Sequence, residues 1–286
     1  MNRRKKFRLH LPSHTILLGE RTLIMGVLNV TPDSFSDGGK FIKPEAAVER
    51  ALEMEHDGAD VLDIGGESTR PGASPLGAAE ELERILPVLE MLRGKLKIPI
   101  SIDTQKAEVA KAAISRGAVI VNNVSALQLD KGLADVVTKH KVGIILMHMR
   151  GKPRTMQNGP FARDVMRDVI KGLREALGRA KQAGIERSRI LIDPGIGFGK
   201  NYRQNFEVLA RLSELSKLGC PIVLGASRKA FLGASLDNAA PEKRTWGTAA
   251  TVAAAILGGA HIVRVHDVKE MAQVARITDR VADARK

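Results

Sequence analysis

The feature that most constrains the fold is a regular alternation of short apolar runs, rich in β-branched residues, with longer amphipathic stretches. Strands and helices that alternate in this way form parallel sheets, because each helix carries the chain back to the start of the next strand. The pattern therefore predicts eight parallel strands. The apolar runs cover residues 23–30, 59–64, 98–102, 118–121, 142–147, 190–192, 222–224 and 262–265.

Stretches of helical period separate these runs, and a further stretch follows the eighth run. Five glycines stand just after such stretches, where a glycine commonly ends a helix. We therefore expect each of the five to be a helix C-cap. The stretches cover residues 44–56, 80–92, 107–116, 133–140, 163–183, 205–218, 247–257 and 268–282, and the glycines are Gly58, Gly117, Gly184, Gly219 and Gly259.

Eight strand and helix pairs can close into a barrel or wind as an open sheet. The barrel is favoured because polar segments follow the strands, and in a (β/α)8 barrel such segments converge on one face. The chain has 286 residues, and about 250 residues is typical of this fold. We predict an α/β protein with a single-domain (β/α)8 TIM barrel. The alternation of apolar and polar residues over 8–18 predicts a short hairpin that closes the bottom of the barrel. We therefore expect residues 1–20 to form a basic extension and hairpin, and residues 21–286 to form the barrel.

The charge balance favours an anionic ligand. The formal net charge is +13, and such a field attracts nucleic acid, anionic lipid or a phosphorylated metabolite. One Trp and one Tyr are too few for the stacking platforms of single-strand binders. A small anion is therefore the preferred interpretation, with no nucleic-acid partner, although much of the excess can equally be plain surface charge.

The expected compartment is the cytoplasm. The single cysteine, Cys220, excludes an intrachain disulfide and a cysteine-based metal site, which fits a reducing environment, and we expect it to be buried filler. No stretch approaches the roughly 20 apolar residues of a membrane span. The basic start is followed by polar residues rather than by the apolar core of a secretory signal.

Two carboxylates and an amide stand at three predicted strand ends: Asp103, Asn122 and Asp193. Together they suit a flat heterocycle with an amidine-like edge, because a carboxylate accepts two parallel N–H bonds while an amide offers a donor and an acceptor. The alternative is that one of these carboxylates caps the following helix.

The loops after the first two strands suit an anion and its metal. Asn29 opens a long polar loop and offers an oxygen of the kind that Mg²⁺ prefers. Residues 63–72 combine glycines, hydroxyls and an arginine that suit a phosphate or carboxylate. Both segments can also be read as structural turns.

The remaining candidates follow the fifth, seventh and eighth runs. Met147 can pack on a flat ligand or in the core, and His148 can titrate near neutrality or be a structural histidine. The segment 225–229 places two cations beside a hydroxyl, which suits an anion or a polar ring. Arg264 and His266 lie on the same side of a strand, where barrels often hold phosphate, although a solvated arginine beside a structural histidine is possible.

These segments together resemble the motifs of the dihydropteroate synthases, in the family order and over nearly the whole chain. The most specific is the run from Met25 to Gly39, whose length makes chance agreement negligible. The resemblance implies a (β/α)8 transferase of folate biosynthesis that joins 6-hydroxymethyl-7,8-dihydropterin diphosphate to p-aminobenzoate. The matching segments are residues 29–39, 63–73, 101–104, 122–123, 193–199, 227–229 and 264–266.

The resemblance also implies roles for individual residues. A homodimer through the outer helices is expected, and sulfonamides would compete at the p-aminobenzoate site. By this likeness Asp103, Asn122, Met147, Asp193, Phe198 and Lys229 contact the pterin; Thr69, Arg70, Arg264 and His266 surround the diphosphate; Phe35, Pro71 and Ser227 frame the p-aminobenzoate; and Asn29 binds Mg²⁺.

The charges suit a dissociative substitution, since no general base is evident and a neutral aryl amine is already nucleophilic. Asp103, Lys229, Arg264 and His266 would then act electrostatically, the cations on the departing diphosphate and Asp103 on the pterin cation.

One position departs from the family. Asn123 stands where the family usually has aspartate, and we expect it to alter hydrogen bonding behind the site. Two other functions stay open. A corrinoid-dependent pterin methyltransferase would share the barrel but would not require the long first loop, and a silent pterin binder could have lost the charged residues that this chain keeps.

Overall fold

The protein is described by a computed structural model, which covers residues 4–31, 43–68, 76–151, 156 and 159–284. Eight parallel strands form one sheet, as predicted. Their bounds differ from the expected runs by up to two residues at either end. The strands are β3 (Leu23–Asn29), β4 (Val61–Gly65), β5 (Ile100–Asp103), β6 (Ala118–Asn123), β7 (Gly143–Met147), β8 (Ile190–Asp193), β9 (Val223–Leu224) and β10 (Ile262–Val265).

The sheet curls into a barrel. Its strand order is β8-β7-β6-β5-β4-β3-β10-β9, and its two ends meet where Ile192 forms a parallel bridge with Ile222. The Ile192 amide also donates to the carbonyl of Pro221 at 3.0 Å. The predicted TIM barrel is therefore confirmed.

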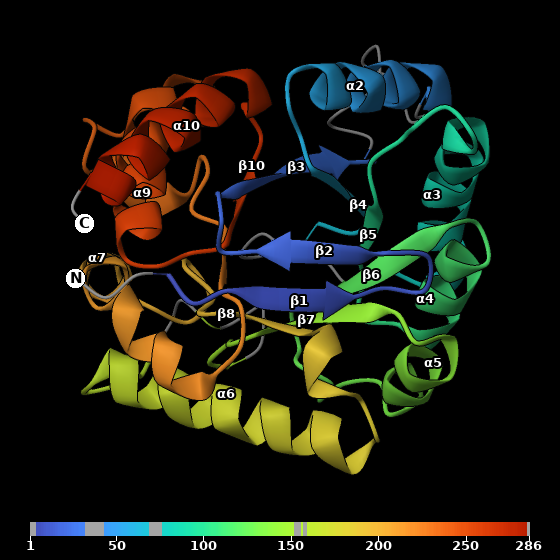
Figure 1. Ribbon diagram of the computed structural model, residues 1–286, viewed down its shortest axis with the longest axis horizontal. Coiled ribbons are helices and arrows are strands. Elements are labelled where there is room, and N and C mark those ends of the chain that lie inside the picture. Colours follow the sequence, from blue (N-terminus) through green and yellow to red (C-terminus); the bar gives the residue numbers. More distant parts are fainter. Residues whose placement is uncertain (1–3, 32–42, 69–75, 152–155, 157–158, 285–286) are drawn as a thin grey trace.

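Helices form an outer ring around the barrel (Figure 1). The segment predicted as one helix over 205–218 is divided, and this prediction was wrong in part. The hydroxyl of Ser216 donates to the carbonyl of Ser213 at 2.7 Å, which competes with regular α-helical bonding and leaves a 3-10 segment. The helices are α2 (Pro44–His56), α3 (Ala78–Leu92), α4 (Ala107–Ile114), α5 (Gly132–His140), α6 (Val165–Gln182), α7 (Tyr202–Ala210), the unpredicted α8 (Ala230–Ala234), α9 (Thr245–Leu257) and α10 (Val268–Ala284), with 3-10 segments η1 (Arg187–Arg189), η2 (Leu212–Leu218) and η3 (Pro241–Lys243).

The five glycines expected to end helices all have positive φ, between +64° and +104°. Gly219 shows the reason, because it follows η2 in the left-handed conformation that reverses the chain towards β9. Cys220, the next residue, is buried as expected.

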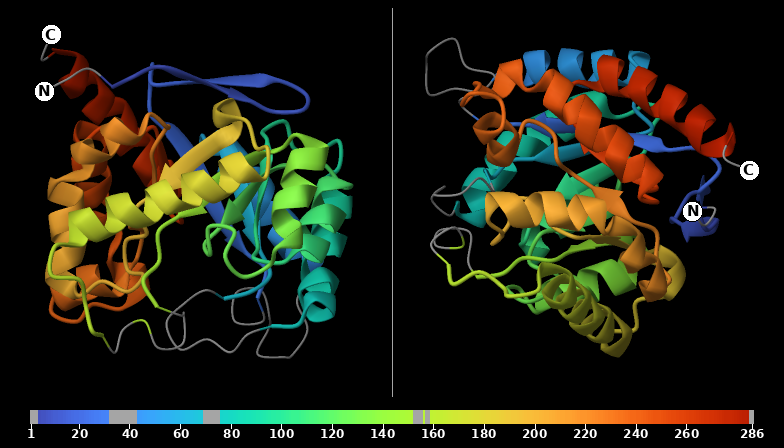
Figure 2. Two further views of the ribbon diagram at one scale, coloured as in Figure 1. Left: turned by 90° about the horizontal axis from the view of Figure 1, so that it is seen from below. Right: turned by 90° about the vertical axis from the view of Figure 1, so that its left-hand side faces the viewer.

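An N-terminal hairpin covers one end of the barrel, as predicted for residues 8–18 (Figures 1 and 2). Strands β1 (Phe7–His10) and β2 (Thr15–Leu18) pair antiparallel. Leu9 and Leu18 are fully buried and belong to the same apolar cluster as Met25 and Ile120 of the barrel interior. The hairpin therefore completes the core at the amino-terminal end of the strands.

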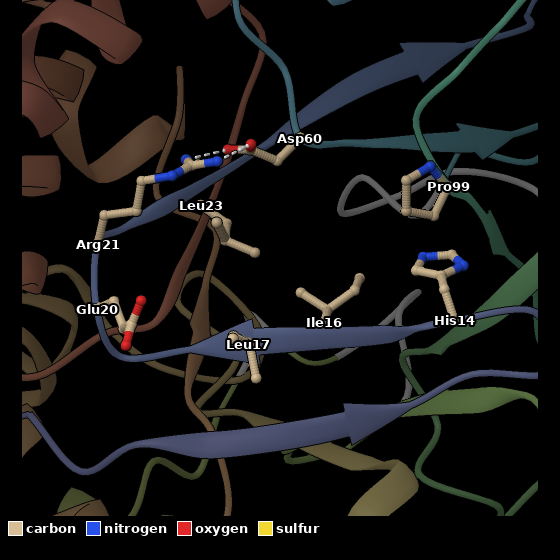
Figure 3. Close-up of a pocket in the computed structure, with 8 residues that line it drawn as sticks. All are labelled: His14, Ile16, Leu17, Glu20, Arg21, Leu23, Asp60 and Pro99. Atoms are coloured by element: carbon tan, nitrogen blue, oxygen red, sulfur yellow. Dashed lines mark hydrogen bonds and ion pairs between the residues drawn. The ribbon is translucent and has the colours of Figure 1, made fainter.

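A cavity of about 450 Å³ lies beside this hairpin. Figure 3 shows its walls, which come from β2, from the start of β3 and from Pro99. The ion pair between Arg21 and Asp60, at 2.5 Å, closes one side. The cavity lies at the opposite end of the barrel from the polar strand ends, so it is not where the predicted chemistry is placed. Among the described residues, no helix is both long enough and apolar enough to traverse a bilayer.

The hairpin yields a stability prediction. Leu18→Ala leaves a cavity in the barrel interior and should lower the free energy of unfolding by about 2–5 kcal/mol. Leu17→Ala is the matched control, because Leu17 is 55% exposed and its loss should cost no more than about 0.5 kcal/mol. Chemical denaturation of both variants measures the difference. Equal losses would show that the hairpin does not pack into the barrel.

Candidate active site

The predicted polar residues lie at the carboxyl ends of the strands. Asp103 ends β5 and is paired in register with Asn122 of β6, while Asp193 ends β8. All three side chains are buried. The charges of Asp103 and Asp193 both act on the pKa of Lys229. The barrel therefore brings together residues that are far apart in the chain.

Arg264 lies between two buried carboxylates. Its Nε donates to Asp63 Oδ2 at 2.6 Å and its second terminal nitrogen donates to Asp103 Oδ2 at 2.8 Å. Asn122 Nδ2 also donates to Asp63 Oδ2, at 3.0 Å. Although burial alone would lower the pKa of Arg264, the two carboxylates raise it. These four residues form one network, which we call the carboxylate network.

Asp63 was missed as a site residue by the sequence analysis, which treated it only as the first residue of a loop. It is fully buried in β4 between apolar neighbours. A lone carboxylate inside a buried strand needs partners, because an unpaired buried charge is costly. That signal was available in the sequence, whereas the identity of its partners was not.

Three polar atoms of this region find no hydrogen-bond partner among the described residues: Asp63 Oδ1, Asp103 Oδ1 and Ser101 Oγ. Burial raises the pKa of Asp103 to about 7, while Arg264 opposes the shift. An unsatisfied buried oxygen is costly in the free protein. The network is therefore suited to a ligand that brings N–H donors.

Lys229 and Phe198 form the opposite wall. Lys229 Nζ lies 4.6 Å from the centre of the Phe198 ring and donates to the carbonyl of Ile196. Burial lowers the pKa of Lys229 to about 8, against the attraction of Asp193. Burial likewise raises the pKa of Asp193. This wall thus presents a cation and an aromatic face.

The alternative that the aspartates cap helices is not supported. Helix α7 is capped by Asn201, which forms a capping box with Gln204, and the N-cap of α4 is Lys106. Asp193 instead accepts from the amide of Gly195 at 2.6 Å, within its own turn.

Ser227 and His266 are in contact across β9 and β10. Their Oγ and Nδ1 atoms are 3.0 Å apart, and the amide of His266 donates to the same hydroxyl at 3.2 Å. Arg228, expected beside Lys229 as a second cation, instead forms an ion pair with Asp267. Only Lys229 of these two cations therefore faces the site.

Met147 and Asn29 also lie at strand ends. Met147 is buried and paired in register with Asp193, which places both side chains on the inner side of the barrel. Asn29 ends β3 and is half-buried. The candidates Phe35, Thr69, Arg70 and Pro71 lie outside the described residues.

Asn123 lies behind the site and is fully buried. Its Nδ2 donates to the carbonyl of Thr104 at 3.1 Å, while its Oδ1 accepts from the amide of Leu127 at 2.7 Å and from Ser125. The second amide therefore joins the loops that follow β5 and β6. Its effect on hydrogen bonding relative to the family's aspartate stays a prediction.

Comparisons with known proteins agree with this geometry. Residues 25–266 match the family model described as pterin binding enzyme. The chain is 48% identical to the dihydropteroate synthase of Synechocystis over 261 residues, which are 91% of this chain and 90% of that protein. The chain belongs to the dihydropteroate synthase family. Membership confirms the resemblance seen in the sequence and makes the chain an enzyme of the transferase class.

Solved structures of dihydropteroate synthases superpose closely on the chain. The Yersinia pestis enzyme in complex with a sulfonamide drug has a TM-score of 0.90 and 40% identity, and the match covers 97% of this chain and 100% of that one. The Xanthomonas albilineans enzyme in complex with 7,8-dihydropteroate has a TM-score of 0.86 and 39% identity, with coverage of 96% and 98%.

The role of Asn123 can be tested with Asn123→Asp. The new carboxylate would face the Thr104 carbonyl without a proton to donate, so we expect a loss of about 1–3 kcal/mol in unfolding free energy at pH 8. Burial raises the pKa of such a carboxyl. The loss should therefore be smaller at pH 5, where the protonated group donates, and should grow as pH rises.

Denaturation at the two pH values measures this effect. Asn238→Asp is the control, because Asn238 is exposed. A loss that is the same at both pH values would contradict the assigned hydrogen bond.

Proposed function

We propose that this chain joins 6-hydroxymethyl-7,8-dihydropterin diphosphate to p-aminobenzoate, and releases 7,8-dihydropteroate and diphosphate for folate biosynthesis. Family membership supports the activity. The structural observation that carries the proposal is the buried, unsatisfied Asp103 Oδ1 beside Asn122. It is a buried acceptor at the carboxyl end of β5, and a pterin N–H edge requires such an acceptor.

The pterin would be read by three side chains. Asp103 accepts through its unsatisfied oxygen. Asn122 offers its Oδ1 and the second N–H of its Nδ2, because one N–H of that group is bonded to Asp63. Asp193 faces Lys229, which would bond the far side of the ring. Met147 and Phe198 would pack on the flat faces.

The diphosphate would lie near Arg264 and His266, with Thr69 and Arg70 from the loop after β4. Arg264 already uses Nε and one terminal nitrogen within the carboxylate network. Its remaining terminal nitrogen is the group that we assign to the diphosphate.

The amide oxygen of Asn29 fits a Mg²⁺ ion, since this hard cation prefers oxygen ligands and is commonly coordinated by protein and phosphate oxygens together. When bound, the ion would neutralise charge on the leaving diphosphate. Asn29 ends β3 and is paired in register with Gly65 of β4.

The reaction we favour is dissociative. Departure of diphosphate leaves positive charge on the pterin, and the negative charge of Asp103 stabilises that cation where it develops. A neutral aryl amine needs no base to attack. Ser227, with Phe35 and Pro71, would frame the p-aminobenzoate. The Yersinia pestis relative forms a complex with a sulfonamide drug, which supports sulfonamide binding by this chain.

A homodimer and a cytoplasmic location complete the proposal. Exposed apolar side chains gather on α7, on α9 and just after α8; they are Tyr202, Phe206, Leu236 and Trp246, the last 84% exposed. A second copy would cover them. The single buried cysteine fits a reducing compartment.

Two other functions were considered. A corrinoid-dependent methyltransferase is disfavoured, because the similarity to dihydropteroate synthases extends over most of the chain. A silent pterin binder is disfavoured because Lys229, Arg264 and His266 are all present and grouped at the strand ends.

The activity is tested by incubating the protein with pterin diphosphate, p-aminobenzoate and Mg²⁺ and detecting dihydropteroate. Asp103→Asn should lower kcat by about 100-fold or more, because it removes the charge that stabilises the cation. Asp135→Asn, an exposed residue of α5, is the control and should keep full activity. Unchanged turnover in Asp103→Asn would rule out the proposed role of Asp103.

Metal dependence makes a separate test. Removal of Mg²⁺ with a chelator should abolish product formation, and added Mg²⁺ should restore it. Asn29→Ala should raise the Mg²⁺ concentration for half-maximal rate by about tenfold, since a metal ligand is lost. If the variant had the same Mg²⁺ requirement as the parent, Asn29 would not be a ligand.

A further inference from the structure

Lys200 is a buried lysine that the reaction as described does not use. Its side chain is 1% exposed. The Nζ atom donates to the carbonyls of Gly195 at 2.8 Å and Phe198 at 3.1 Å, and lies 3.0 Å from His148 Nδ1. An ammonium group has three N–H donors, and all three are satisfied here.

His148 continues this contact towards α6. Its Nε2 is 3.4 Å from Asp168 Oδ2, and Asp168 Oδ1 accepts from Arg150 at 2.9 Å. Burial lowers the pKa of His148 to about 4, and burial lowers the pKa of Lys200 only to about 7. A neutral imidazole that accepts from Lys200 at Nδ1 can donate from Nε2 to Asp168. Of the two interpretations of His148, the lowered pKa favours the structural histidine.

The imidazole ring fits against α6 only because residue 172 is glycine. A Cβ at Gly172 would lie 2.6 Å from His148 Cδ2, which is closer than Cβ atoms come to non-bonded atoms in real structures. Glycine within a helix costs about 0.5–1 kcal/mol relative to alanine. Another glycine of the same helix, Gly178, has nothing within 4 Å of such a Cβ.

The loop that Lys200 holds is the loop that builds the Lys229 wall. It begins at Asp193, and Lys229 contacts both its Ile196 carbonyl and its Phe198 ring. Gly195 connects Lys200 to Asp193. Its carbonyl accepts from Lys200, and its amide donates to Asp193 Oδ1. Movement of this loop would displace three groups assigned to the pterin.

We propose that Lys200, held by His148 against Gly172, is a positioning residue that sets the pterin-binding geometry of Asp193, Phe198 and Lys229. This inference rests on the proposed function, since it concerns the same pterin site. Lys200 itself touches no substrate in this account.

The decisive comparison is Gly172→Ala against Gly178→Ala. Gly172→Ala should displace the His148 ring and raise KM for pterin diphosphate by about tenfold, while KM for p-aminobenzoate stays within about twofold. Gly178→Ala makes the same change on the same helix without a clash, so both KM values should stay unchanged. A merely structural role for His148 would alter the melting temperature without this split between substrates.

Lys200→Met is a second variant that removes the ammonium and keeps the apolar stem. Calorimetric binding of 6-hydroxymethyl-7,8-dihydropterin to the parent, Gly172→Ala and Lys200→Met proteins measures the pterin site without turnover. Weaker binding by about tenfold in both variants is expected. Parent-like pterin affinity in folded Gly172→Ala would overturn the inference. A parent protein that binds pterin but makes no product would instead refute the proposed activity and leave this inference standing.

Discussion

The structure of the active site depends on Arg264, a guanidinium held between two carboxylates inside a barrel. An unpaired charge inside a protein is costly, so a buried guanidinium needs carboxylate partners. Arg264 on β10 therefore ties β4, through Asp63, to β5, through Asp103. Asn122 is bound to the same Asp63 oxygen. These bonds fix the side chains relative to one another and leave Asp63 Oδ1 and Asp103 Oδ1 without a hydrogen-bond partner among the described residues.

The two walls of the site are held by different means. The carboxylate network is held by direct bonds between side chains of neighbouring strands. The Lys229 wall depends on a loop, and Lys200 holds the carbonyls of that loop from behind. Burial raises the pKa of Asp103 to about 7 and lowers the pKa of Lys229 to about 8, so each wall contains a buried titratable group.

The barrel was largely predictable from the sequence because its signals are local. Apolar runs predicted the strands, glycines predicted the helix ends, and the alternation of apolar and polar residues predicted the hairpin. The break after α7 was not foreseen, since it depends on a Ser216 bond that competes with the helix. Arg228 was misplaced because its partner, Asp267, is 39 residues away. The partners of Asp63 were missed because only the folded sheet, in which β3 pairs with both β4 and β10, brings Arg264, 201 residues distant, beside it.

The central claim is that the carboxylate network creates the pterin site, and Asp63 tests it most directly. Asp63 anchors Arg264 and Asn122 but is not assigned to the substrate. Calorimetric titration of the parent and Asp63→Asn proteins with 6-hydroxymethyl-7,8-dihydropterin should show binding weakened by about tenfold or more in the variant, because the amide removes the negative charge that pairs with Arg264. A folded Asp63→Asn protein with parent-like affinity would contradict the account.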